Sequence, residues 1–112
     1  MTLEYQAPGD EGAEELVAAI DEGDPWRLRE AMVAAAYNVD DWEWLQSIFV
    51  RLLGHADPTV RAVAATCLGH VARIHRRLDT ATVVPRIEAL LSDPQTAGFA
   101  ETALEDIDAA VR

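Results

Sequence analysis

The sequence predicts an all-α protein that forms a short solenoid of about three antiparallel helix pairs. The main observation is that the dipeptide Asp-Pro recurs at intervals of 33 and 36 residues, at Asp24-Pro25, Asp57-Pro58 and Asp93-Pro94. A second observation is that no segment alternates apolar and polar residues for long enough to form a half-buried strand. A recurrence of about 30–40 residues with two helices per unit is typical of solenoids, in which units stack side by side.

Each Asp-Pro is expected at the start of a helix. The Asp side chain accepts hydrogen bonds from backbone N–H groups that the first turn leaves unpaired, and Pro has the φ angle of that turn. An apolar stretch with helical spacing precedes the second and third dipeptides. Its members are Leu45, Ile48 and Leu52 in the second unit, and Val84, Ile87 and Leu91 in the third. Each unit therefore contains one helix before the dipeptide and one after it.

The pattern places six helices along the chain. They cover Glu11–Asp21, Pro25–Asn38, Asp41–Gly54, Pro58–His75, Thr80–Leu91 and Gln95–Val111. Because the connections are short, neighbouring helices should run antiparallel. We expect residues 11–112 to form a single domain, preceded by a flexible N-terminal segment at residues 1–10.

Helical spacing also predicts which side of each helix is buried. In the fourth helix the predicted buried stripe comprises Val60, Val63, Ala64, Cys67, Val71 and Ile74. Gly69 lies off this stripe, where it would let a neighbouring helix approach closely. In the last helix the residues expected to face inward are Ala100, Ala103, Leu104, Ile107 and Val111. Its outer side carries acids, as suits the terminal unit of a solenoid.

The charge is strongly acidic and unevenly distributed. The formal net charge is −11, and residues 1–24 hold eight acids and no base. By contrast, residues 51–77 hold five arginines, all three histidines and one acid. The net charge argues against nucleic-acid binding, which needs cations to replace the counterions of the phosphates. It would steer association with a basic protein, although it could also serve solubility alone.

The cellular compartment is indicated by the cysteine content and the apolar runs. The single cysteine, Cys67, excludes an intrachain disulfide and suits a reducing compartment. Residues 1–10 lack the basic and apolar regions of a signal peptide. No apolar run reaches the roughly 18–20 residues that span a bilayer. We therefore expect a cytoplasmic protein that does not enter membranes.

The middle unit resembles a known repeat family. The segment from His55 to Ala65, with Asp57-Pro58-Thr59-Val60-Arg61 followed by alanines, resembles the HEAT-repeat signature. Its continuation to His75 and the ending Ala100–Ile107 are similar to small bacterial HEAT-like proteins, some of them associated with polymorphic toxin systems as immunity proteins. The resemblance implies a short right-handed HEAT-like α-solenoid. It also implies a non-catalytic protein-binding module, in its sharpest form an immunity protein that neutralises a toxin by direct binding.

The outer units depart from the HEAT signature. After Asp24-Pro25, the pair Leu28-Arg29 lies one residue later than Val60-Arg61 does in the middle unit. In the third unit, Thr96-Ala97 stands where that pair would be. A ladder of arginines through all three units is therefore not expected.

Three aromatic residues are candidates for contacts with a partner. Trp26 and Tyr37 lie on the side of the second helix opposite its apolar face, and Trp44 is predicted to project away from the apolar face of the third. Tryptophan and tyrosine are common anchors of protein interfaces, but large aromatic residues are also often buried in the core. Both interpretations stay open at this point.

The fourth helix carries the remaining candidates. His70, Arg73 and Arg77 form a polar stripe that would receive acidic groups of a partner, or would pair with acids of neighbouring helices. Asp57, Pro58 and Arg61 are assigned a structural role instead. In that role Arg61 is expected to pair with Asp57, four residues before it on the same helix.

No catalytic or metal-binding set is recognisable. Cys67 and His70 are one turn apart, but two ligands without a second pair are a weak indication of a metal site. The sequence has no glycine-rich phosphate loop and no paired Cys or His motif. We therefore expect no enzyme, metal or cofactor. The alternatives to a monomeric protein-binding module are a HEAT-like protein that handles nucleic acid or a cofactor, and a structural scaffold.

Overall fold

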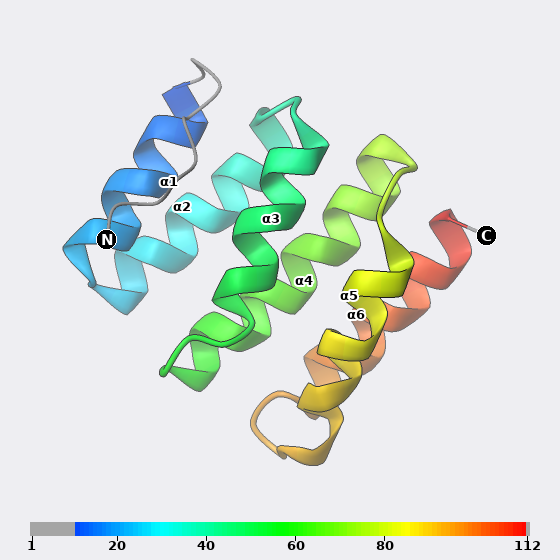
Figure 1. The fold of residues 1–112 in the computed structure, drawn as a ribbon. Coiled ribbons are helices and arrows are strands. Elements are labelled where there is room, and N and C mark those ends of the chain that lie inside the picture. The colour runs from blue at the N-terminus through cyan, green and yellow to red at the C-terminus, as the bar shows by residue number, and fades with distance from the viewer. Residues whose placement is uncertain (1–10, 112) are drawn as a thin grey trace.

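The computed structural model describes residues 11–111 and contains only helices and their connections in that range (Figure 1). The elements are α1 (Glu11–Glu22), α2 (Pro25–Asn38), α3 (Trp42–Leu52), α4 (Pro58–His75), α5 (Thr80–Glu88), the short 3₁₀-helix η1 (Ala89–Ser92) and α6 (Ala97–Ala110). The predicted all-α class is confirmed. The flexible segment expected at residues 1–10 lies outside the described residues.

The helices form two layers (Figure 1). The first helix of each pair lies in one layer (α1, α3 and α5), and the second helix lies in the other (α2, α4 and α6). Helix α4 is the centre of the molecule, because it packs against α2, α3 and α6. We call the side of α2, α4 and α6 that faces away from the first layer the second-helix face. Within residues 11–111, no helix is long and apolar enough to cross a membrane.

The first two Asp-Pro dipeptides start helices as predicted. The Oδ1 atom of Asp24 accepts a hydrogen bond from the backbone N–H of Trp26 at 3.2 Å, and α2 begins at Pro25. The Oδ1 atom of Asp57 accepts from the backbone N–H of Thr59 at 2.8 Å, and α4 begins at Pro58. In both cases the carboxylate satisfies a donor that the first helical turn leaves unpaired.

The third Asp-Pro forms a turn before the helix instead. Asp93 accepts a hydrogen bond from the backbone N–H of Gln95 at 2.9 Å, but α6 begins only at Ala97. The hydroxyl of the buried Thr96 donates to the carbonyl oxygen of Leu90 at 2.8 Å. This contact ties the turn back to η1 and delays the helix by two residues relative to the predicted start at Gln95.

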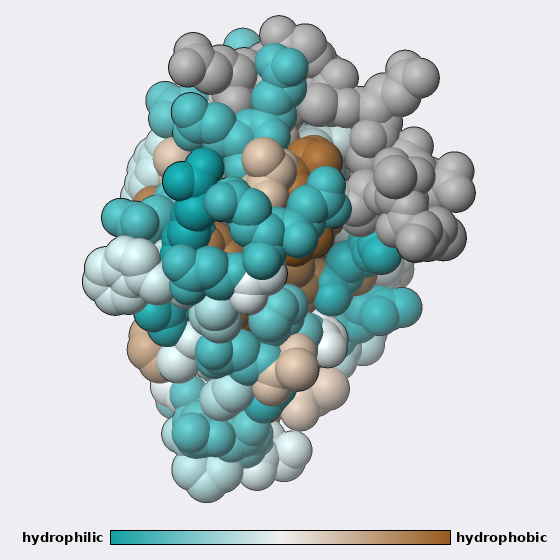
Figure 2. Space-filling model, turned by 90° about the vertical axis from the view of Figure 1, so that its left-hand side faces the viewer, coloured by the Kyte–Doolittle hydropathy of each residue, from teal (hydrophilic) through white to brown (hydrophobic). Residues whose placement is uncertain are grey.

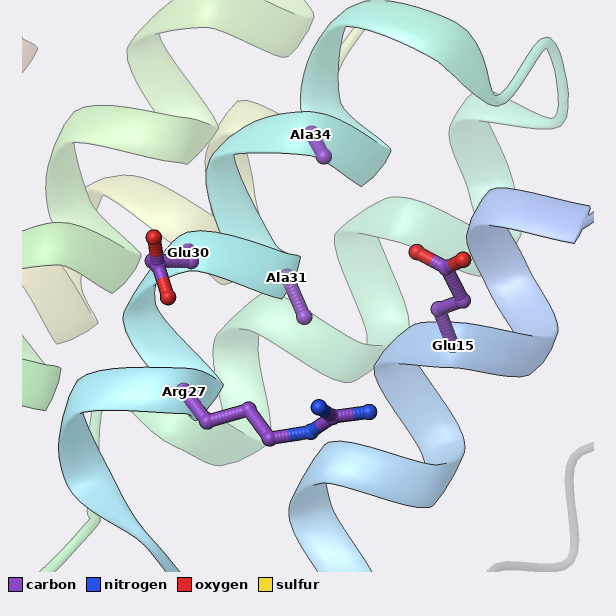
Figure 3. Close-up of a pocket in the computed structure, with 5 residues that line it drawn as sticks. All are labelled: Glu15, Arg27, Glu30, Ala31 and Ala34. Carbon is purple, nitrogen blue, oxygen red and sulfur yellow. The ribbon is translucent and has the colours of Figure 1, made fainter.

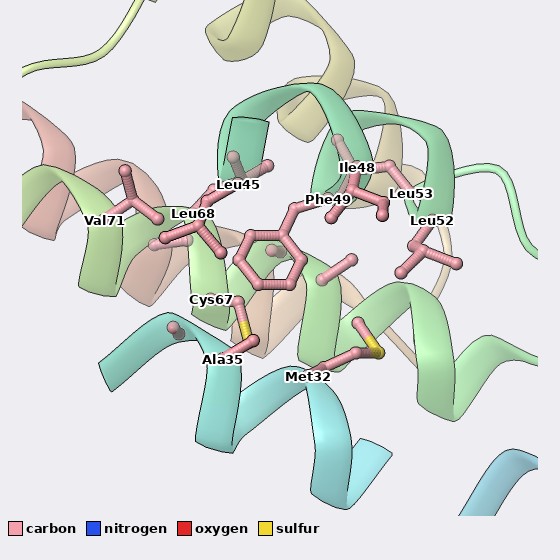
Figure 4. Packing of buried hydrophobic residues seen from close by; sticks show 14 of the residues in the cluster. Met32, Ala35, Leu45, Ile48, Phe49, Leu52, Leu53, Cys67, Leu68 and Val71 are labelled. Carbon is pink, nitrogen blue, oxygen red and sulfur yellow. The ribbon is translucent and has the colours of Figure 1, made fainter. Parts of the chain in front are cut away.

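The core is centred on Phe49 of α3 (Figure 4). The ring lies between the two layers, with Met32 of α2 and Cys67 of α4 beneath it in this view. All three side chains are fully buried. The predicted apolar triplet of the second unit, Leu45, Ile48 and Leu52, is buried as expected.

The third unit buries a different triplet from the one predicted. Val83, Ile87 and Leu90 are buried, whereas Val84 is half-buried and Leu91 is exposed. The chain tightens into the 3₁₀-helix η1 after Glu88. Because a 3₁₀-helix has three residues per turn, Leu90, three residues after Ile87, comes to the buried side.

Helix α4 buries more of its surface than the predicted stripe. Val60, Ala64, Cys67 and Val71 are buried as expected, but Val63 is only half-buried and Ile74 is 45% exposed. The prediction for Ile74 is wrong because neighbours cover α4 on three sides, which shifts the buried arc toward Leu68 and Ala72. The side left open, which carries Val63 and Ile74, is part of the second-helix face.

Gly69 lies at a close approach of α6 to α4, as the sequence predicted. A Cβ atom on Gly69 would lie 3.5 Å from the Cα atom of Ala103 and 3.4 Å from the Oδ2 atom of Asp106. Ala100, Ala103 and Ile107 of α6 are buried against this junction, with Leu104 and Val111 half-buried beside them. Small residues thus bring the second and third helix pairs together.

Candidate functional site

Exposed apolar side chains gather on the second-helix face. With the exception of Leu91, the large apolar residues that stay exposed in the described part of the chain lie on α2, α4 and α6. They are Trp26, Val33, Tyr37, Ile74 and Phe99. By contrast, the α1 side of the molecule is largely hydrophilic (Figure 2). A concentration of exposed apolar groups on one side indicates an interaction surface.

Trp26 and Tyr37 are exposed, as one of the two sequence interpretations required. Trp26 is 65% exposed and Tyr37 is 55% exposed. The guanidinium carbon of Arg29 lies 5.3 Å from the centroid of the Trp26 ring, which is the geometry of a cation–π contact. Trp26 therefore presents one ring face to Arg29, and most of its remaining surface contacts solvent.

Trp44 is not part of this face, because it does not project away from the apolar side of α3 as predicted, and the alternative of burial in the core holds for it. The side chain is 7% exposed and belongs to the core. Trp44 precedes Ile48 by four residues, which places both on the same side of α3. The buried arc of α3 includes Phe49 as well, so it is wider than the predicted one. The indole Nε1 atom is buried and has no hydrogen-bond partner among the described residues.

Phe99 was not identified as a candidate from the sequence. It lies in the first turn of α6 and is 53% exposed. A signal for it existed, because Phe99 falls outside the inward-facing set predicted for this helix. A large aromatic residue off the apolar stripe of a terminal helix has no core to enter and therefore contacts solvent.

Trp26, Val63 and Phe99 surround a shallow hollow that crosses three helices. Its volume is about 400 Å³, and Ala62 forms part of its floor. Of the described residues that line it, Arg29 is the charged one. A second hollow of about 500 Å³, which includes Val33, adjoins it on α2. Concave apolar surface with few polar groups is typical of binding sites.

His70 and Arg73 belong to a polar cluster at the other end of the same face. The ring of His70 lies 5.0 Å from that of Tyr37, between centroids. The Nδ1 atom of His70 accepts a hydrogen bond from Arg73, whose Nε atom lies 4.0 Å from the Oδ2 atom of Asp106. Burial lowers the pKa of His70 below its ordinary value of 6.5, and the charge of Arg73 lowers it further, against the opposing effect of Asp106. His70 is therefore a neutral acceptor at neutral pH.

The residues of the predicted polar stripe, His70, Arg73 and Arg77, thus have different surroundings. His70 and Arg73 are engaged with neighbouring helices, which was the alternative left open by the sequence. Arg77 is exposed beyond the last turn of α4. Because Arg73 already faces a carboxylate, the stripe is a weaker cationic surface than its composition suggested, which counts against nucleic-acid binding.

Arg61 has a structural role, but its predicted partner is wrong. It donates hydrogen bonds to the carbonyl oxygens of His55 at 2.7 Å and Ala56 at 3.0 Å, and its NH2 atom lies 3.3 Å from the Oδ2 atom of Asp93. Asp57 is engaged elsewhere, because the side chain and backbone of Thr59 donate to it. These hydrogen bonds lower the pKa of Asp57 below 3.8. Arg61 therefore links the second unit to the Asp-Pro of the third.

A separate polar hollow lies between α1 and α2 (Figure 3). It has a volume of about 320 Å³, and its walls carry Glu15 and Glu30 around the small side chains of Ala31 and Ala34. Arg27 also lines it and forms an ion pair with Glu22, with 2.7 Å between Nε and Oε2. Exposed ion pairs of this kind contribute little to stability.

The cysteine and the groups that could ligate a metal bear on the sequence expectations for Cys67 and His70. Cys67 is buried, and burial raises the pKa of its thiol to about 12, so the thiol stays protonated. Between residues 11 and 111, no group of three or more His, Cys, Asp or Glu side chains could hold a metal ion. The features that stand out on the surface are those of a binding face.

A family model and solved structures both match this chain. The HEAT repeat family model matches residues 45–75, which correspond to most of α3 and α4. A chain in the crystal structure of a CDI complex from Cupriavidus taiwanensis LMG 19424 superposes with a TM-score of 0.79 at 30% sequence identity. The match covers 97% of this chain and 96% of that one. Among curated proteins, no sequence matches.

Proposed function

The chain belongs to the family of small HEAT-repeat proteins represented in the Cupriavidus taiwanensis CDI complex, and on this premise we propose that it is an immunity protein that neutralises a toxin by direct binding. A CDI complex is one of contact-dependent inhibition, in which a toxin is held by its immunity protein. The observation that carries the proposal is the full-length structural match, because it extends over all three helix pairs rather than one repeat.

The second-helix face is the proposed toxin-binding surface. Trp26 and Tyr37 are exposed aromatic residues of the kind that dominate binding energy at protein interfaces. His70 and Arg73 lie along the same face and supply its polar edge. We add Arg77, which is exposed just after the end of α4, to that edge. Phe99 joins them from α6. Trp44 is left out because it belongs to the core.

The proposed mode of action is stoichiometric and non-catalytic. The protein works in the cytoplasm as a monomer and covers the toxin rather than modifying it. Its net charge of −11 would accelerate association with a basic toxin domain, because complementary charge steers diffusional encounter. Salt should therefore slow association more than it speeds dissociation.

The test is to search the neighbouring genes for a toxin domain and to mix that domain, once purified, with the purified chain. We expect a one-to-one complex in light scattering, and complete loss of toxin activity at one equivalent of the chain. Toxin inactivation at far below one equivalent would contradict a stoichiometric mode, and absence of a complex would contradict the proposal itself.

Two variants locate the surface. Trp26→Ala or Tyr37→Ala should weaken toxin binding by roughly 30-fold or more, as truncation of an interface anchor does. The matched control is Leu91→Ala, which removes an exposed apolar side chain from η1, away from this face. If Leu91→Ala weakens binding and the two aromatic variants do not, the toxin binds elsewhere.

A further inference from the structure

The hollow between Trp26, Val63 and Phe99 lies where side chains of α2, α4 and α6 meet on the second-helix face. Its walls are mainly apolar and come from α2, α4 and α6, so a single side chain placed in it would contact all three helix pairs. Thr59 and Gln95 also line it and are neutral. Arg29 is thus the charged member among the described residues that line the hollow.

Among the described residues, no carboxylate forms an ion pair with Arg29, although Glu30 lines the adjoining hollow beside it. Asp57 is the acid whose charge interacts with Arg29 across the first junction, but the backbone and hydroxyl of Thr59 already donate to its Oδ1 atom. Arg29 instead stacks against the ring of Trp26. A second cation at this ring would be repelled by the charge of Arg29, whereas an anion would be attracted by it. The hollow therefore selects for a negative group beside an apolar one.

We propose that this hollow receives an apolar side chain of the toxin that has a carboxylate next to it, and that Arg29 binds the carboxylate. The inference rests on the proposed function and deepens it by naming the chemistry that the partner must present. It concerns one contact only, so it is compatible with a toxin that is basic as a whole. Arginine suits this role because its planar guanidinium pairs with both oxygens of a carboxylate while its face stays on an aromatic ring.

The first test does not need the toxin. Indole-3-propionate and tryptamine have the same indole ring and opposite charges, and each is titrated into the ¹⁵N-labelled chain. We expect indole-3-propionate to shift the indole N–H signal of Trp26 and the amide signals of Val63 and Phe99, and to bind about threefold tighter than tryptamine. Arg29→Gln should remove this preference, while Phe99→Ala should weaken both ligands. Equal binding of the two ligands, or shifts elsewhere on the molecule, would overturn the inference.

The second test uses the toxin. Phe99→Glu and Arg29→Glu should each weaken the complex about 30-fold or more, since both place a negative charge where a carboxylate binds. Leu91→Glu is the matched control and should bind like the unaltered chain. A toxin that binds the unaltered chain and Phe99→Glu equally well would overturn this inference and leave the proposed function standing. A toxin that does not bind the unaltered chain would overturn the proposed function, and the indole titration would then decide the inference.

Discussion

The two junctions between successive helix pairs use their arginines in different ways. At the second junction, Arg61 donates to backbone carbonyls and reaches Asp93 of the next unit, with 3.3 Å between NH2 and Oδ2. At the first junction, Arg29 lies one position later relative to its Asp-Pro than Arg61 does. Its guanidinium lies over Trp26, and Asp57 of the next unit is held by Thr59.

A shift of one residue accounts for this difference. Successive residues on an α-helix are rotated by about 100°. The later arginine therefore lies at the hollow on the second-helix face, where its charge still acts on Asp57 of the next unit. The second junction thus uses its arginine to join two units. The first junction leaves its arginine on the surface, beside the largest exposed aromatic residue. A departure from the repeat signature has turned a structural residue into one that is available for binding.

The largest expected effect concerns the core beneath the first junction. Phe49→Ala should lower the free energy of unfolding by about 3–5 kcal/mol, because it leaves a cavity between Met32 and Cys67. Phe99→Ala is the matched control and should change it by no more than about 0.5 kcal/mol, since that ring is half exposed. Urea denaturation measures both. Comparable losses in the two variants would mean that the second-helix face contributes to folding as much as the core does.

The next effect concerns the close contact at the second junction. Gly69→Leu should destabilise the protein by about 1–3 kcal/mol, because the side chain would push α6 away at Ala103. Gly69→Ala is its control. A Cβ atom there meets its nearest neighbours at ordinary contact distances, so alanine should gain up to about 1 kcal/mol from its better helix propensity. Thermal unfolding should show opposite shifts in the midpoint. A loss in both variants would show that the junction tolerates no side chain.

The comparison of the two arginines can be tested directly. Arg61→Ala should cost about 1–2 kcal/mol, because it removes the contact with Asp93 and leaves the carbonyl of His55 without a donor. Arg29→Ala should change stability by no more than about 0.5 kcal/mol. Chemical denaturation of the two variants under the same conditions gives the difference. Equal costs would contradict the assignment of one arginine to structure and the other to the surface.

The smallest expected effect is on the pH dependence of stability. The pKa of His70 is lower in the folded chain than its ordinary value of 6.5, so the unfolded chain takes up the proton first as the pH falls. Stability should therefore decrease as the pH drops through 6.5 toward the folded pKa. His70→Gln should reduce this slope, and the proton resonance of the His70 ring reports the folded pKa. A pKa above 6.5 would show that Asp106 outweighs burial and Arg73.

Local features of the fold were predictable from the sequence, whereas contacts between helices were not. Helices Pro25–Asn38 and Pro58–His75 have the bounds predicted. Their starts were predictable because Asp caps and Pro act within one turn. The errors at Trp44, Ile74 and the partner of Arg61 have a common cause. Each depends on which neighbour covers a given side of a helix, and a periodic pattern within one helix does not contain that information.

In the candidate site, too, features of a single helix were predictable and contacts between helices were not. Exposed Trp26 and Tyr37 were foreseen as one of two alternatives because they lie opposite an apolar face of their own helix. The hollow was not foreseen, since it needs Trp26, Val63 and Phe99 from three helices to come together. Phe99 lies almost 40 residues from Val63 in the chain, so only the stacking of the helix pairs unites them.

The uncovered side of α4 has a consequence for how such a protein can change over evolutionary time. Substitutions on an exposed surface away from caps and cores usually alter stability by no more than about 0.5 kcal/mol. Ile74 is therefore under little constraint from folding, while Leu68 and Ala72 on the covered sides are under much. Such proteins can therefore adapt to a changed partner through single substitutions at exposed positions of the second-helix face. Each substituted protein along such a series remains folded.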